Sequence, residues 1–503
     1  MTEGEHEQTT SVAEGDRLTR LREAVTGQLP RARADLEALV AIPGISADPA
    51  RQGDLALSAE AVEALFRDLG VGSVTTSTVA GGAPAILVDV PGPAGTPTVL
   101  LYAHHDVQPV GDPSAWTSDP FTATERDGRL YGRGTGDDKA GVVVHLATLR
   151  ALLAVDGHLP VGVRVLIEGE EESGSPSLEP FLAAHARALA SDVLVIADAA
   201  NWAVGTPALT VSLRGLVDCT VRVETLDHGV HSGMYGGPVP DALTTLCRLL
   251  ATLHDDRGDV AIAGLVTDGF DAPGTAALPV DFRVDGTGTA VSGLEPLDPD
   301  ARGGAGDPAG APELDEAVFR AVAGLLDGVD LIGSGSITER LWSRPAVSVL
   351  GIDATPADDA ANVLTPSARA KVSLRIPPGQ DPGAAARALS DHLLLHAPWG
   401  ARVIVVPGAT GEAWAAETGG VVQATARAAF TTAFGTPVVA TGSGGSIPLV
   451  AAYTDVNPGS SVLVTAVEDP ATRAHSTDES LHLGDFASAV LAHTLLLDAL
   501  GRS

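Results

Sequence analysis

Hydrophobic positions in the first two hundred residues alternate between helical and strand spacing. Residues 17–40 and 55–69 repeat apolar side chains at the spacing of an amphipathic helix, and 139–155 is a more uniformly apolar helix. Short apolar runs predict buried strands at 85–90, 98–103, 161–168 and 192–197. Helices that alternate with buried strands predict an α/β domain with a mostly parallel sheet flanked by helices.

The pattern changes near residue 211. The following segments predict, in order, a strand, a helix, two strands, a helix and a strand: 209–224, 241–253, 346–352, 368–376, 382–396 and 401–406. The first of these strands is long and is interrupted at Gly215. This β-α-β-β-α-β order is typical of a small α/β sandwich. We therefore expect an inserted domain over 211–408. The first domain would comprise residues 16–210 and resume at 409–503, and the acidic residues 1–15 would form a disordered tail.

Composition and charge restrict the partners. The formal net charge of -33 would repel a nucleic-acid backbone or an anionic membrane, so we expect neither partner. The first residues lack the apolar stretch of a signal peptide, and the two cysteines are too few for a secreted disulfide framework. Residues 435–453 are uncharged but broken by Gly, Ser and Pro, unlike a membrane helix. These features favour a cytoplasmic protein.

The first candidate site residues lie in the segment LLYAHHDVQP. Side chains two positions apart share one face of a strand, so His104 and Asp106 point together while His105 points away. A metal-ligating histidine commonly donates its other ring nitrogen to a carboxylate, which Asp106 could supply. The motif alone is a weak signal, because a second HxD at 254–256 is more typical of a solvated surface.

Further carboxylates and a histidine occur at other segment ends. Asp137 in GRGTGDDKAG precedes an apolar helix, where it could also cap free backbone N–H groups. Glu171 and Glu172 follow a strand in a run of carboxylates that would repel one another unless cations neutralise them or water surrounds them. Asp198 ends another strand, and His475 lies in a polar loop. Sites in parallel sheets form at the carboxyl ends of strands, so these imidazoles and carboxylates indicate a centre for zinc, manganese or cobalt.

The motifs occur in an order that resembles a known family. They are HHDVQP, GRGTGDDK, EGEEESGS, the Asp198 strand followed fifteen residues later by LRG, HSGMYGG, LWSRPAVSVLGI, SLRIPP, GGSIP and AHSTDE. From residue 40 to the end, the chain resembles the di-metal aminoacylase and carboxypeptidase superfamily, metallopeptidase family 20, and within it the cytosolic nonspecific dipeptidase and carnosine dipeptidase branch. The resemblance implies a zinc-exopeptidase-like catalytic domain and a lid or dimerisation domain inserted into it.

The resemblance also implies two divalent metal ions per chain, with zinc preferred. Asp137 would bridge them, His104 and Asp198 would complete one site, and Glu172 and His475 the other. Glu171 would be the general base and Asp106 the partner of His104.

Substrate contacts are implied in the same way. His231 would reach across a homodimer, formed through the inserted domain, into the partner's active site. Arg375, Gly445 and Ser446 would hold the C-terminal carboxylate of a small peptide substrate.

The expected activity is hydrolysis of dipeptides or short peptides with a free C-terminal carboxylate. Two metals would convert a bridging water to hydroxide at neutral pH. Glu171 would accept the proton that the water loses and pass it to the leaving amine. The same site could cleave any amide next to a carboxylate, so an N-acyl amino acid deacylase is the alternative. A non-catalytic metal-binding scaffold would have lost Glu171 or a ligand, and all are present.

Overall fold

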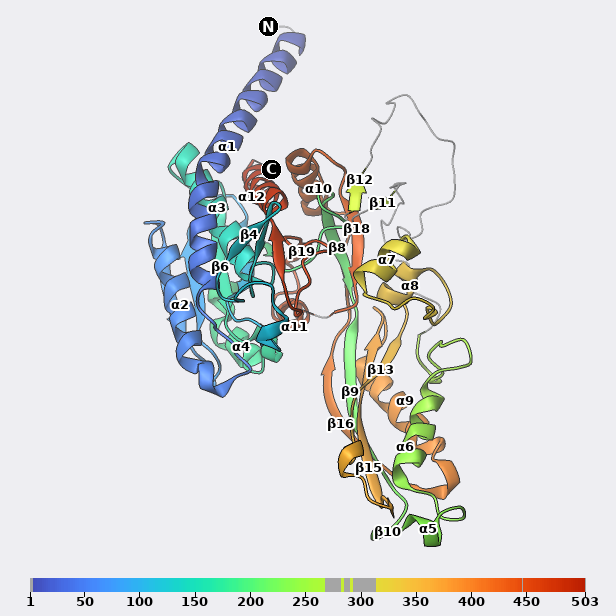
Figure 1. The fold of residues 1–503 in the computed structure, drawn as a ribbon. Helices are drawn as coiled ribbons and strands as arrows, with labels where there is room; N and C mark the ends of the chain where they lie inside the picture. Colours follow the sequence, from blue (N-terminus) through green and yellow to red (C-terminus); the bar gives the residue numbers. More distant parts are fainter. Residues whose placement is uncertain (1–2, 267–281, 285–289, 293–313, 446, 503) are drawn as a thin grey trace.

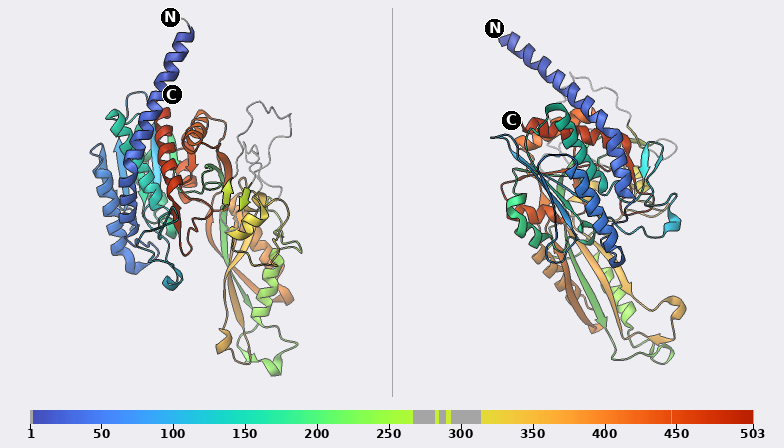
Figure 2. Two further views of the ribbon diagram at one scale, coloured as in Figure 1. Left: turned by 45° about the horizontal axis from the view of Figure 1, so that its top comes forward. Right: turned by 90° about the vertical axis from the view of Figure 1, so that its left-hand side faces the viewer.

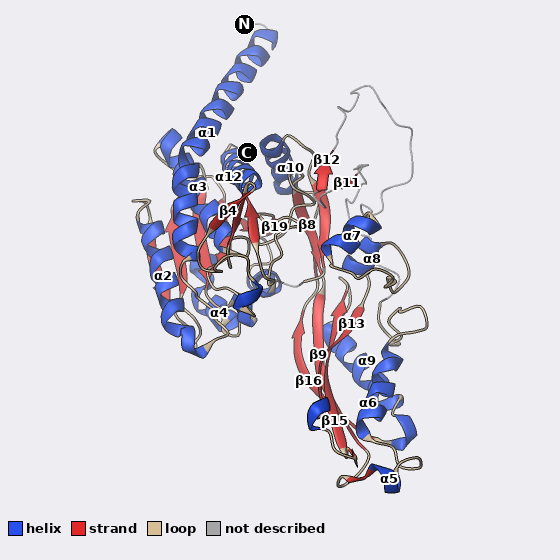
Figure 3. Cartoon of the chain, in the orientation of Figure 1, coloured by secondary structure: helices blue, strands red, loops and turns tan. Residues whose placement is uncertain are grey.

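The computed structural model describes residues 3–266, 282–284, 290–292, 314–445 and 447–502. Its elements form two units, each with its own sheet and its own hydrophobic core (Figure 1). The second unit is narrower and extends away from the first, as the further views confirm (Figure 2). Helices cover both sheets (Figure 3).

The sheet of the first unit is parallel at its centre and antiparallel at its edges. Its strand order is β1-β2-β6-β3-β7-β19-β8-β17, and β18 pairs with β8. The bounds are β1 Ser73–Ser77, β2 Ala85–Val90, β3 Thr98–His104, β6 Gly162–Glu168, β7 Val193–Ile196, β8 Ala208–Leu213, β17 Trp414–Ala415, β18 Val439–Ser443 and β19 Ser461–Thr465. The pairs β6–β3, β3–β7 and β7–β19 are parallel, whereas β1–β2, β2–β6, β19–β8 and β17–β8 are antiparallel. The sequence predicted a largely parallel sheet, and the central strands are indeed parallel, whereas the strands at the edges are antiparallel.

Helices pack on both faces of this sheet. Their bounds are α1 Glu3–Val40, α2 Gln52–Arg67, α3 Lys139–Asp156, α4 Leu178–Leu189, α10 Val421–Phe434, α11 Pro448–Val456 and α12 Leu483–Leu500. Strand β3 shows why both faces are covered, because Leu101 packs in the core with α1, α3 and α12 while Leu100 packs with α4 and α11. Helix α12 is apolar enough to cross a membrane by composition, but it is largely buried against α3 and α10. It is therefore placed as a core helix.

Helix α1 differs from the sequence expectation. It begins at Glu3, so residues 3–15 are helical, where a disordered tail was expected. Figure 1 shows this end of the helix projecting beyond the rest of the first unit. The C-terminal half packs through Leu21, Val25 and Leu36, and the segment before Pro30 holds no other proline. Extending an anchored helix requires no new nucleation, which explains why the helix continues outward.

The second unit has the predicted β-α-β-β-α-β order. Its elements are β9 Gly215–Glu224, α6 Ala242–Leu250, β13 Ala346–Asp353, β15 Ser367–Ile376, α9 Pro382–Leu395 and β16 Arg402–Gly411. The sheet order is β13-β15-β9-β16, and α6 and α9 share one core with its inner face. Smaller elements are β10 Val230–His231, α5 Ser232–Tyr235, β11 Phe282–Val284, β12 Ala290–Ser292, α7 Glu316–Val322, α8 Ile337–Trp342 and β14 Val363–Leu364. A sheet of β4 Thr124–Arg126, β5 Arg129–Tyr131 and β20 Ser480–His482 lies in the first unit.

The two units join at residue 214. The segment 209–224, expected as a long strand interrupted at Gly215, forms β8 in the first sheet and β9 in the second. Gly215 permits this change, because a Cβ there would lie 2.5 Å from the carbonyl oxygen of Gly411 on β16. The expected borders at 211 and 408 therefore fall inside β8 and β16. The hydrophobic periodicity of the sequence could not locate these borders, because the apolar spacing of both strands continues across the junction.

Candidate metal centre

The candidate ligands lie where the central strands end. His104 is the last residue of β3, Glu172 lies in a short 3-10 turn after β6, and Asp198 follows β7. Since β6, β3 and β7 are parallel neighbours, their carboxyl ends meet at one edge of the sheet. Asp137 arrives on the turn before α3, and His475 on the loop between β19 and β20.

These side chains form two groups that share Asp137. His104, Asp137 and Asp198 make one group, and Asp137, Glu172 and His475 make the other, with the ligand atoms of each within 4.8 Å of one another. His104 Nε2 lies 3.1 Å from Asp137 Oδ1 and 3.9 Å from Asp198 Oδ2. His475 Nε2 lies 2.9 Å from Asp137 Oδ2 and 3.3 Å from Glu172 Oε2. Each oxygen of Asp137 thus faces a different group.

The donor set fits divalent cations. His104 is 1% exposed, and its Nε2 has no hydrogen-bond partner among the described residues. Its Nδ1 lies 3.1 Å from the carbonyl oxygen of Asp106, and donation to that oxygen leaves Nε2 as the ligand nitrogen. A buried nitrogen without a partner, facing carboxylates, is the arrangement that a metal ion satisfies.

The charges of the cluster perturb its titration. Burial, together with the nearby charges of Asp137 and Glu172, raises the pKa of Asp198 to about 7 against the opposing effect of His104. Burial also acts to raise the pKa of Asp137, but its contacts with His104 and His475 outweigh this and hold the pKa below its usual value. Contacts with Asp137 and Glu172 raise the pKa of His475 to about 11. Cations at the two groups would therefore replace protons.

Asp106 and Gln108 hold the ligands in place. The carboxylate of Asp106 lies 3.4 Å from His104 Nδ1, and it accepts hydrogen bonds from the backbone N–H groups of Glu171 at 3.2 Å and Glu172 at 3.1 Å. Gln108 donates to both oxygens of Glu172, from its backbone N at 3.1 Å and from Nε2 at 2.7 Å. Asp106 therefore connects the end of β3 to the turn after β6.

Asp138 takes the capping role that Asp137 could have filled. It is the N-cap of α3 and accepts from the backbone N of Gly141 at 3.1 Å and of His104 at 3.2 Å. The Asp137–Asp138 peptide bond is cis. The two adjacent carboxylates thus have different positions: Asp138 caps helix α3, and Asp137 faces the ligand groups.

Glu171 lies beside the ligand groups and belongs to neither. Burial raises its pKa well above the usual value; the charge of His104 acts to lower the pKa, and the charges of Asp198, Glu172 and Asp137 act to raise it. The carboxylate of Glu171 is therefore not one of the candidate metal ligands.

The remaining predicted site residues lie elsewhere. His231 is on β10, at the tip of the second unit and far from the first sheet (Figure 1), and its side chain is exposed. Arg375 is at the end of β15 and half-buried, and its guanidinium has no ion pair or hydrogen bond among the described residues. Gly445 is exposed, and its backbone N donates to Ser443 Oγ at 3.1 Å. Ser446 lies outside the described residues.

Three residues were missed by the sequence reasoning, namely Gln108, Arg214 and Glu479. Gln108 and Glu479 stand inside the quoted motifs HHDVQP and AHSTDE, so their place in the motif was the available signal. Arg214 follows β8 at the junction, 7% exposed, and donates from Nη1 to the carbonyl oxygens of Arg340 at 3.2 Å and Arg344 at 3.3 Å. Burial, together with the charge of Arg375, lowers the pKa of Arg214 to about 10.

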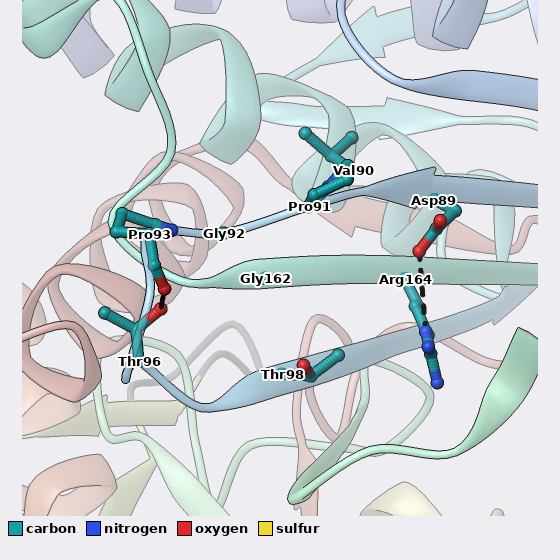
Figure 4. A pocket seen from close by; sticks show the side chains of 9 residues that line it. All are labelled: Asp89, Val90, Pro91, Gly92, Pro93, Thr96, Thr98, Gly162 and Arg164. Carbon is teal, nitrogen blue, oxygen red and sulfur yellow. Dashed lines mark hydrogen bonds and ion pairs between the residues drawn. The ribbon is translucent and has the colours of Figure 1, made fainter.

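A separate pocket lies at the opposite end of the sheet. It has a volume of about 340 Å³ and is lined by Asp89, Val90, Pro91, Gly92, Pro93, Thr96, Thr98, Gly162 and Arg164 (Figure 4). Thr98 and Gly162 begin the strands that end in His104 and Glu168. The pocket is therefore distinct from the ligand groups.

Known proteins share this organisation. The model for peptidase family M20/M25/M40 matches residues 100–499, which include every ligand of both groups. The chain belongs to this family. The family assignment made from the motifs is thereby confirmed, and the chain is a peptidase-family protein with a cluster of candidate metal ligands at its strand ends.

Individual relatives match most of the chain. A cysteinylglycine-S-conjugate dipeptidase of Corynebacterium striatum is 33% identical over 450 residues, covering 88% of this chain and 90% of the relative. The Beta-Ala-His dipeptidase of Homo sapiens is 27% identical, covering 79% and 74%. The solved structure of a di-peptidase from Saccharomyces cerevisiae superposes with a TM-score of 0.75 at 22% identity, covering 97% of this chain and 99% of that one. This last likeness shows the fold.

Proposed function

We propose that the protein is a metal-dependent dipeptidase that hydrolyses the amide bond of dipeptides or short peptides with a free C-terminal carboxylate. The observation that carries the proposal is the pair of ligand groups sharing Asp137, with Glu171 beside them and outside both. The named relatives support it, because they include dipeptidases at 33% and 27% identity. We further propose that two divalent ions bind per chain, zinc preferred and manganese or cobalt possible substitutes, since imidazole and carboxylate ligands suit these metals.

The residues of the cluster and those around it have different roles in the proposed reaction. His104, Asp137 and Asp198 would hold one ion, and Asp137, Glu172 and His475 the other. When bound, such a pair of ions lowers the pKa of a water molecule from about 15.7 toward 7 and polarises the scissile carbonyl. Glu171 takes a proton from the attacking water and delivers it to the leaving amine nitrogen. Asp106 keeps Glu171 in position by accepting its backbone N–H at 3.2 Å.

Arg375 is the proposed clamp for the substrate carboxylate. Its guanidinium has no partner among the described residues and lies close enough to Arg214 to lower that residue's pKa. Neither arginine has a carboxylate partner there, so an anion would relieve their repulsion. Gly445, which follows β18 along the chain, and Ser446 are proposed to contribute to the same carboxylate site.

The position of His231 supports a homodimer with shared active sites. The residue lies at the tip of the second unit (Figure 1), so within one chain it does not approach the ligand groups. The edge strand β13 exposes Leu350 at 64% and Ile352 at 44%, and a second copy of the chain could pair along such an edge. In the dimer, His231 of one chain would stabilise the developing oxyanion in the active site of the other chain. The cytoplasmic location stays a prediction from the sequence.

The test is a substrate panel assayed with zinc, manganese and cobalt in turn. Dipeptides, dipeptide amides, N-acetyl amino acids and N-succinyl amino acids should be compared on protein whose metal content is measured. Hydrolysis of free dipeptides with two ions bound supports the proposal. Preference for the N-acyl compounds would assign the deacylase instead. Turnover that survives complete removal of metal would refute the metal-dependent mechanism.

A further inference from the structure

A fully buried ion pair lies directly behind the turn that carries Asp137. Glu479 is 0% exposed and Arg133 is 1% exposed, and Arg133 Nη1 donates to Glu479 Oε2. Neither residue belongs to the two ligand groups. Removing two charges from water is costly, and replacing a buried pair by apolar side chains often stabilises a protein. Stability alone therefore gives no reason for this pair.

The second oxygen of Glu479 holds the turn itself. Oε1 accepts the backbone N–H groups of Gly134 at 3.0 Å, Gly136 at 3.0 Å and Asp137 at 3.2 Å. The turn is built for this contact, since Gly134 has φ +83° and a Cβ at Gly136 would lie 2.5 Å from Thr472. The backbone of Asp137 is thus fixed from behind while its carboxylate faces the ligand groups.

Arg133 extends the same connection to two other loops. Its Nη2 donates to the carbonyl oxygen of Ser476 at 3.1 Å, next to His475, and to that of Pro109 at 3.3 Å, next to Gln108. Gln108 in turn holds Glu172. The Arg133–Glu479 pair therefore contacts the turn of Asp137, the loop of His475 and the loop that positions Glu172. These are the three ligands of one group.

We infer that Glu479, together with Arg133, is a positioning residue that sets the backbone of Asp137 and His475 at the spacing both metal ions require. The inference rests on the proposed metal-dependent function. An apolar pair could fill the same volume, but it could not accept the three N–H groups of the turn. Outer groups that orient metal ligands commonly change metal affinity by about 10- to 100-fold when they are removed.

Glu479→Gln separates this role from packing. The amide keeps the shape of the side chain and one acceptor oxygen, but its NH2 group cannot accept from Arg133 or from the turn. Metal-free protein should therefore bind Zn²⁺ or Mn²⁺ about 10- to 100-fold more weakly, measured by titration calorimetry. Turnover should recover at high metal concentration, because Glu171 and the ligands remain.

The matched control is Asp35→Asn. Asp35 on α1 forms a largely buried pair with Arg150 on α3, within the same unit and outside both ligand groups. This variant should lower the melting temperature while leaving metal affinity unchanged. Glu479→Asp is the second variant in case the glutamine substitution prevents folding. It keeps the charge that compensates Arg133, but it is too short to reach the whole turn, so metal affinity should fall here as well.

Each outcome decides the inference. Weaker metal binding in a folded Glu479 variant, with normal binding in Asp35→Asn, supports it. Unchanged metal affinity in a folded Glu479 variant overturns it, as does an equal loss of affinity in Asp35→Asn, because the effect would then follow stability. A wild-type chain that binds no divalent ion would instead refute the proposed function, which keeps the two failures apart.

Discussion

Replacing Glu171 by Gln removes a carboxylate that lies beside the cluster and belongs to neither ligand group. The glutamine side chain has nearly the same shape, and the backbone N–H of residue 171 can still donate to Asp106. What is lost is the ability to accept a proton from water. The substitution therefore tests proton transfer with little change to the metal sites.

The expected loss of kcat is about 100- to 10,000-fold, the usual contribution of a positioned general base. At about 1.36 kcal/mol for each factor of ten, this corresponds to about 2.7 to 5.4 kcal/mol of activation free energy. Metal content should stay at two ions per chain. The melting temperature of metal-free protein should not fall, because Asp198, Glu172 and Asp137 all raise the pKa of Glu171 by repulsion that the amide no longer feels.

Steady-state hydrolysis of a dipeptide, elemental analysis and thermal unfolding measure these three quantities. Glu170→Gln is the neighbouring control. Glu170 accepts from the backbone N of Ala83 at 2.9 Å and of Ser177 at 2.7 Å, so its loss should reduce stability by about 1 to 3 kcal/mol while kcat is retained. Glu172→Gln should instead lose metal. If Glu171→Gln keeps most of its turnover, or loses a metal ion, the assignment of the base is wrong.

Three further predictions address the substrate, the dimer and acid stability. Arg375→Ala should weaken transition-state binding by about 1.5 to 3 kcal/mol in kcat/KM, and dipeptide amides should be poor substrates of the wild type; equal rates on a dipeptide and its amide would exclude the clamp. Refolding inactive His231→Ala and His475→Ala chains together should restore about a quarter of wild-type activity, since about half of randomly paired dimers are mixed and each has one intact site. No recovery in a verified heterodimer would exclude the shared site. Burial lowers the pKa of His145 from 6.5 to about 4, so the unfolded state binds the extra proton and stability falls by about 3 kcal/mol as pH drops from 6.5 to 4. His145→Phe keeps the ring beside His493 and should show a shallower fall in calorimetry over that range; an identical pH dependence would contradict the assignment.

Much of the first unit was predictable because its elements follow from local patterns. Runs of Val and Leu predicted the central strands, since a strand covered on both faces is apolar throughout. The antiparallel edges were not predictable, because strand direction in a sheet depends on how distant segments return to it. The helical residues 3–15 were missed for a related reason, as a polar segment is helical here through its continuity with a packed helix.

The types of the candidate ligands were also predictable from the sequence, but the role of each carboxylate was not. The local sequence left open whether Asp137 capped a helix or bound a metal, and only the structure places Asp138 at the cap and Asp137 between the groups. Asp106 was expected to orient His104. Its further contacts with the backbone of Glu171 and Glu172 join two strand ends that lie far apart in sequence.

The sequence by itself determined the family of this protein, the imidazole and carboxylate side chains that are its candidate metal ligands, and the strand ends that carry them, because motifs and hydrophobic spacing are local properties of the chain. The tertiary structure decided which oxygen faces which group, which residues hold the ligands from behind, and that His231 lies far from the ligand groups of its own chain. Those facts depend on contacts between segments separated by hundreds of residues. Such contacts form only when the sheet assembles, and no local pattern encodes their distances.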